Sequence, residues 1–149
     1  MTVQAQIKSP SIRVLLSQIS FSATEALCNC YGGYNAMVFP FVLDNAIRSS
    51  RDYEPAFWRH YPLNNGGAFF APDLPKSHVT LNIYRSEFYD TVTCEAAGII
   101  CTLFAYYQLA CNTRDLFFLD HYDRLMAFAR GHREAVHCRS GSLEMPLRK

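Results

Sequence analysis

The sequence predicts an α+β protein in which a small antiparallel β-meander packs against several α-helices in a single domain. Three observations support this prediction: aromatic segments flank an Asn-Asn-Gly-Gly turn, an alternating apolar segment follows, and two apolar helical patterns come after it. The length of 149 residues is usual for one domain. Because half of the residues are hydrophobic and only 18% are charged, we expect a packed core.

The N-terminal part of the chain has the weakest pattern. The first ten residues are polar and end at Pro10, so we expect a flexible arm over 1–10, one domain over 11–138 and a flexible tail over 139–149. Ile12 to Phe21 is apolar with interspersed serines and does not distinguish a strand from a helix. The stretch Cys28 to Gly33 predicts a loop, because paired glycines favour turns.

A helical spacing of apolar residues runs from Tyr34 to Arg48. Proline is tolerated in the first turn of a helix and disrupts the interior, so we expect this helix to begin at or near Pro40.

The central aromatic segment predicts a hairpin. Phe57 to Leu63 has the composition of a strand, and Ala68 to Ala71 predicts a second strand that stops before Pro72. Between them, Asn65-Gly66 is the expected central pair of a tight turn, because both residues tolerate positive φ. The hairpin reading excludes a phosphate loop, since Gly67 leads into a strand and no Lys-Ser/Thr follows.

The second half of the chain predicts a third strand and two helices. Val79 to Tyr84 alternates with one apolar face and extends the meander. Thr91 or Thr93 can cap a helix whose run Ala96–Ala110 leaves few polar positions, so it should be enclosed on most sides. Asp115 to Arg130 predicts an amphipathic helix against the core.

Charge and targeting signals restrict the location and the ligands. The apolar run is about fifteen residues long, below the roughly twenty needed to span a bilayer, so we expect no membrane insertion. Six cysteines without a secretory signal favour a reduced, cytoplasmic setting. A formal charge of +1 indicates neither a strong DNA-binding face nor the carboxylate surface of a DNA mimic.

No motif in the sequence predicts a catalytic, metal or cofactor site. The cysteines of Cys28-x-Cys30 are separated by one residue, where zinc and thiol-redox motifs have two to four. The five histidines are scattered, and we interpret them as surface or structurally bonded residues. Asp52, Glu54 and Asp73 fit turn and capping roles better than an acid-base pair. A cysteine and a histidine could still meet in space, so a small hydrolase stays an alternative, as does a transcriptional regulator.

The segment Asp52 to Pro72 (DYEPAFWRHYPLNNGGAFFAP) resembles the central motif of the ArdB/KlcA antirestriction family. Ala96 to Ile100 is similar to its alanine-rich helix, and His121 to Ala135 is similar to its last long helix and the turn that follows. Together the similar stretches cover roughly Tyr34 to Val136, and residues 1–33 and the tail are not part of the resemblance.

This resemblance implies a small non-enzymatic protein of plasmids, other mobile elements or bacterial genomes that lets incoming DNA escape type I restriction without mimicking DNA. It implies a protein partner, either a type I restriction-modification component or another host DNA-processing protein, and we expect a monomer or weak homodimer. The aromatic residues around the hairpin exceed what one face of two short strands must bury; packing on the helices is favoured, and exposed rings would suit protein contacts. The expected partner-contact residues lie in or beside the hairpin: Tyr53, Trp58, Tyr61, Asn65, Gly66, Phe70 and Asp73.

Overall fold

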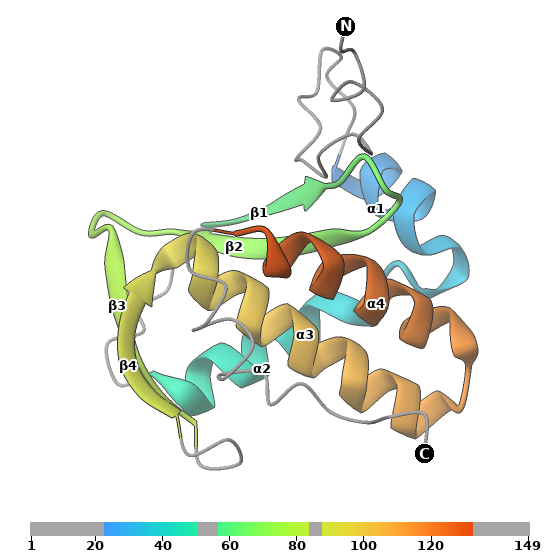
Figure 1. Cartoon of the computed structure of the whole chain (residues 1–149). Coiled ribbons are helices and arrows are strands. Elements are labelled where there is room, and N and C mark those ends of the chain that lie inside the picture. Colours follow the sequence, from blue (N-terminus) through green and yellow to red (C-terminus); the bar gives the residue numbers. More distant parts are fainter. Residues whose placement is uncertain (1–22, 51–56, 84–87, 133–149) are drawn as a thin grey trace, which may run out of the picture.

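The computed structural model describes residues 23–50, 57–83 and 88–132, whose arrangement is shown in Figure 1. Helices and antiparallel strands occur together in one α+β domain, which confirms the predicted fold class. Ile12–Phe21, Tyr53 and the expected arm and tail lie outside the described residues. The elements in chain order are α1 (Ala23–Tyr31), a 3₁₀ helix η2 (Gly32–Tyr34), α2 (Val38–Ser49), β1 (Phe57–Pro62), β2 (Ala68–Asp73), β3 (His78–Ile83), β4 (Phe88–Thr93), α3 (Cys94–Thr113) and α4 (Leu116–Arg130).

The strands form two separate antiparallel hairpins, β1 with β2 and β3 with β4. The expected third strand is present, and its Val79, Leu81 and Ile83 are buried as predicted. It pairs with β4, however, and does not extend the first hairpin into one meander. Strand β4 was not predicted because Asp90, which lies opposite Leu81, interrupts its apolar alternation.

Strand β2 continues past its expected end, because Pro72 pairs with Trp58 and Asp73 pairs with Phe57. The prediction that the strand stops before Pro72 is therefore wrong. Among the described residues, β2 has a strand neighbour on one side only, so a residue without an N–H is tolerated in it.

Helix α1 corrects a further expectation, because Cys28 and Cys30 lie on a helix and not in a loop. The helix continues to Tyr31, and the paired glycines change the chain direction only after it: Gly32 adopts a φ of +58°, and η2 begins there. The next helix, α2, begins at Val38, and Pro40 falls in its first turn as predicted.

Helix α3 is the centre of the core and packs against α2, α4 and β2 (Figure 1). The hydroxyl of Thr93 accepts a hydrogen bond from the Ala96 N–H at 3.1 Å, which confirms the predicted cap. By length and composition this helix could cross a membrane, but 72% of its most apolar window is buried inside the protein, as in a core helix. The prediction of an enclosed helix is confirmed.

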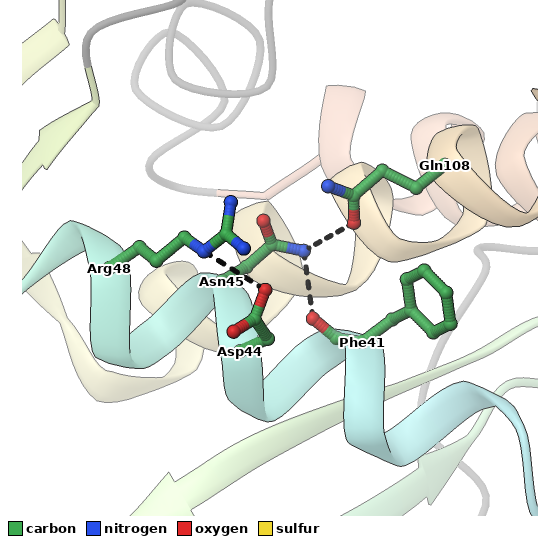
Figure 2. A network of polar contacts seen from close by, with 5 residues as sticks. All are labelled: Phe41, Asp44, Asn45, Arg48 and Gln108. Carbon is green, nitrogen blue, oxygen red and sulfur yellow. Dashed lines mark hydrogen bonds and ion pairs between the residues drawn. The ribbon is translucent and has the colours of Figure 1, made fainter.

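A polar contact joins α2 to α3 (Figure 2). The Asn45 side-chain amide donates to Gln108 Oε1 and to the Phe41 carbonyl oxygen, each at 2.9 Å. On the same helix, Asp44 and Arg48 form an exposed ion pair at 3.0 Å, one turn apart. The Asn45–Gln108 contact orients α2 on α3, whereas the exposed Asp44–Arg48 pair lies within α2 and contributes only a few tenths of a kcal/mol, about 0.3–0.5.

Candidate partner-contact surface

The β1–β2 hairpin is enclosed by helices on both faces of β2. On one face, Phe69 stacks on Phe128 of α4, with ring centroids 5.7 Å apart. On the other face, Phe70 contacts Phe39 of α2 at 5.2 Å and Tyr31 at 6.3 Å. Both aromatic residues of β2 therefore build the core, which agrees with the favoured packing interpretation.

Two tyrosines and two histidines form a buried polar network beside this hairpin. The Tyr106 hydroxyl donates to the Ala68 carbonyl oxygen at 2.7 Å, and the hydroxyls of Tyr31 and Tyr106 are 2.8 Å apart. His60 Nε2 lies 3.2 Å from the Tyr31 hydroxyl. The His121 ring contacts both tyrosine rings, at 5.1 and 5.4 Å. This network connects α1, β1, β2, α3 and α4.

Counting donors assigns the tautomers of both histidines. Because Tyr106 gives its proton to Ala68, Tyr31 must donate to Tyr106, and His60 must then donate from Nε2 to Tyr31. His121 Nε2 lies 3.2 Å from the Cys30 carbonyl oxygen, which can only accept. Both rings therefore carry the proton on Nε2. The two Nδ1 atoms are buried and have no hydrogen-bond partner.

Burial keeps both imidazoles neutral. Desolvation, together with the charge of His121, lowers the pKa of His60 from 6.5 to about 4, and desolvation also lowers the pKa of His121. Protonation would place an N–H donor on a buried Nδ1 atom with no acceptor. Burial likewise raises the pKa of Tyr31 and Tyr106, so all four groups are uncharged near neutral pH.

We expect the domain to lose stability as the pH falls from about 6.5 to about 4. The unfolded chain binds a proton at His60 in this window and the folded chain does not, so stability is present above pH 6.5. The shift of His60 corresponds to about 3 kcal/mol. Urea unfolding of wild type and His60→Gln at several pH values measures the effect.

The His60→Gln variant should show a shallower pH dependence, whereas the matched His78→Gln variant, in which an exposed histidine is replaced, should follow the wild type. Equal slopes for wild type and His60→Gln would contradict the assignment.

The tip of the hairpin differs from the predicted turn. The Leu63 N–H donates to the Gly67 carbonyl oxygen at 2.8 Å, and the Gly66 N–H donates to the Leu63 carbonyl oxygen at 3.1 Å. Asn64 and Asn65 are thus the central pair, and Gly66 follows with a φ of +89°. The prediction that Asn65-Gly66 is central is wrong, because Asn65 does not take the positive φ that such a turn demands.

Asn65 attaches this tip to α4. Its Nδ2 donates to the Arg124 carbonyl oxygen, and its Oδ1 accepts from the Gly67 N–H, both at 2.9 Å. The hairpin is therefore held on the helix by a side chain from the turn itself.

The expected contact residues have different exposures. Phe70 is only 5% exposed, so its ring fills the core. Trp58 and Tyr61 are half-buried: Trp58 meets Phe39 edge to face at 5.7 Å, and Tyr61 stacks on Phe69 at 5.0 Å.

The outer end of the hairpin carries exposed side chains of the candidate surface. Asp73 is exposed and pairs with Arg59 at 3.0 Å. Phe57, which lies opposite Asp73 and was not among the expected contacts, is 85% exposed. Phe57 is the first residue of β1, an edge strand, and it lies on the same strand face as the exposed Arg59. These two features could have identified it as exposed.

Burial holds two of the described thiols in the protonated, weakly nucleophilic form. Burial raises the pKa of Cys30 to about 11 and that of Cys101 to about 12, so both are protonated at neutral pH. Cys28 and Cys111 are exposed free thiols. In the described ranges no group of three or more His, Cys, Asp or Glu side chains could hold a metal ion.

This geometry defines a small α+β domain whose hairpin is anchored on its helices. The family model of antirestriction proteins matches residues 51–140, about three fifths of the chain. The chain belongs to the antirestriction protein family.

Among curated relatives, the chain is similar to the antirestriction protein KlcA of Escherichia coli, with 37% identity over 88 residues, covering 56% of this chain and 61% of KlcA. It is also similar to the uncharacterised protein YafX of Escherichia coli, with 36% identity over 98 residues and 64% of each chain covered. The chain thus spans about three fifths of the length of these relatives.

A solved structure has a similar fold over nearly its whole length. Its TM-score is 0.79 at 27% sequence identity, and the match covers 91% of this chain and 99% of that chain. The work on that structure concerns the KlcA and ArdB proteins and describes antirestriction activity against type I DNA restriction systems in vivo but not in vitro.

Proposed function

We propose that this chain protects incoming plasmid or phage DNA from type I restriction inside the cell, through contacts with another protein. The observation that carries the proposal is the family match, joined to the similarity with a structure whose antirestriction activity is described in vivo but not in vitro. An activity that needs the cell is the behaviour expected of a protein that works through an additional cellular component. The proposed partner is a type I restriction-modification component or another host DNA-processing protein.

The charge of the chain supports protein contacts over DNA mimicry. A DNA mimic needs a dense negative surface, and a non-specific DNA binder needs a basic face that releases counterions. Neither kind of surface agrees with the balanced charge of this chain, which has 14 basic and 13 acidic residues. We propose a non-enzymatic, cytoplasmic protein that is a monomer or weak homodimer, whose contact surface includes the half-buried and exposed residues of the hairpin.

The proposal is tested by the plating of unmodified phage on cells that carry a type I restriction system. Expression of the chain should raise the plating efficiency relative to an empty vector. Cells without the restriction system are the control, and in them expression should change nothing. Unchanged plating with soluble, folded protein would remove the proposal.

A thiol enzyme is the alternative that the same assay separates. The variant Cys28→Ser/Cys30→Ala/Cys94→Ala/Cys101→Ala/Cys111→Ser, with Cys138→Ser, should keep full protection if it folds. Loss of protection by this folded variant would instead favour a cysteine-dependent reaction.

A further inference from the structure

The side chain of Arg124 lies along the tip of the β1–β2 hairpin. It projects from α4, and its backbone carbonyl oxygen receives the hydrogen bond from Asn65. A Cβ atom at Gly66 would overlap Arg124 Nη1, and a Cβ atom at Gly67 would lie 2.9 Å from Arg124 Cβ. The arginine therefore runs over the backbone of both glycines, from its first carbon to its guanidinium group.

The two glycines thus have a structural purpose beyond the turn. Any side chain at Gly66 or Gly67 would displace the arginine. The stem of Arg124 packs on the backbone, and this packing restricts the position of a long side chain that would otherwise be free to rotate. Packing on the turn therefore positions the guanidinium.

Arg124 is exposed, and among the residues that the structure describes no carboxylate pairs with it. The sequence spacing does not explain why Arg124 lacks such a pair. Asp120 precedes Arg124 by one helical turn, as Asp44 precedes Arg48 on α2, where the ion pair forms at 3.0 Å (Figure 2). On α4 the arginine lies over the hairpin tip instead, so no carboxylate of the described ranges occupies its guanidinium donors.

We propose that Arg124 is a contact residue for a carboxylate group on the protein partner, with the Asn-Asn-Gly-Gly turn as its positioning element. A planar guanidinium held on a rigid element can bind a carboxylate through two parallel hydrogen bonds. One positioned cation suits one acidic side chain of a protein, whereas a duplex phosphate backbone requires several cations on one face. The inference rests on the proposed antirestriction function.

The test compares three variants in the phage plating assay. Arg124→Gln keeps most of the stem and removes the charge, so protection should fall at least about ten-fold. Arg124→Lys keeps the charge but loses the planar guanidinium with its two parallel donors, so protection should lie between those of wild type and Arg124→Gln. Arg48→Gln is the matched control, because Arg48 is an exposed arginine already paired within its own helix, and it should retain wild-type protection.

Thermal unfolding and soluble yield should be the same for all three variants and the wild type, which separates a contact role from a structural one. Full protection by Arg124→Gln, with the wild type active, would overturn the contact proposal and leave the antirestriction function standing. Failure of the wild type would remove both. If the protein shifts duplex DNA in a gel, and if this binding weakens with Arg124→Gln and with added salt, the proposed carboxylate partner would be overturned in favour of a DNA phosphate.

Discussion

Replacement of Gly98 by alanine is expected to destabilise the domain by about 3 kcal/mol or more, despite the better helix propensity of alanine. Gly98 lies where α3 crosses β2. A Cβ atom there would lie 2.5 Å from the Ala71 Cα, 2.6 Å from the Ala71 Cβ and closer still to the Phe70 carbonyl oxygen. These are backbone atoms and a Cβ atom, so no side-chain rotation can relieve the overlap.

The measurement is urea unfolding of Gly98→Ala beside the matched Gly33→Ala, because nothing lies within 4 Å of a Cβ atom at Gly33. The first variant should unfold at much lower denaturant or fail to accumulate, and the second should behave like the wild type. A Gly98→Ala protein as stable as the wild type would mean that α3 and β2 do not pack at this distance.

Replacement of Tyr106 by phenylalanine should cost about 2–3 kcal/mol, since the buried Ala68 carbonyl oxygen loses this donor and the buried Tyr31 hydroxyl loses its acceptor. The lost hydroxyl donates to the Ala68 carbonyl oxygen and accepts from Tyr31. All three residues are almost completely buried, so water cannot replace the missing group without opening the core. The ring itself is retained, and with it the packing of α3.

Tyr31→Phe is the comparison for this variant. It leaves the bond from Tyr106 to Ala68 in place, removes the donor to the Tyr106 hydroxyl and leaves one buried donor, His60 Nε2–H, without its acceptor. The order of stability should therefore be wild type, Tyr31→Phe, then Tyr106→Phe, measured by denaturant midpoints at constant slope. The reverse order would contradict the donor assignment of the network.

The local patterns predicted most of the elements. Strand β1, the apolar face of β3, the cap at Thr93 and the limits of α4 follow from alternation, capping and helical spacing, which depend on neighbouring residues alone. Two of the failures concern the second hairpin. Asp90 interrupts the apolar alternation of β4, so this strand was not predicted. The pairing partner of β3 depends on how the strands pack in space.

The candidate surface was less accessible to sequence reasoning. Trp58, Tyr61, Asn65 and Asp73 do lie on one hairpin, but their exposure depends on helices from other parts of the chain. Tyr31 and Tyr106 meet across 75 positions, and no spacing rule connects them. Arg124 is 59 positions from Asn65 in the sequence, so its contact with the hairpin could not be predicted without the structure.

The sequence by itself determined the α+β class, the resemblance to the antirestriction family and the presence of a glycine turn between two aromatic strands. Periodicity and turn chemistry are properties of short segments, so they can be read without coordinates. Only the tertiary structure decided that Phe70 is core, that Phe57 is exposed, and that Gly66 and Gly67 make room for Arg124. Burial and close approach depend on which distant segments pack together, and this is why the turn first identified as a hairpin signal proves also to be the support for a charged side chain.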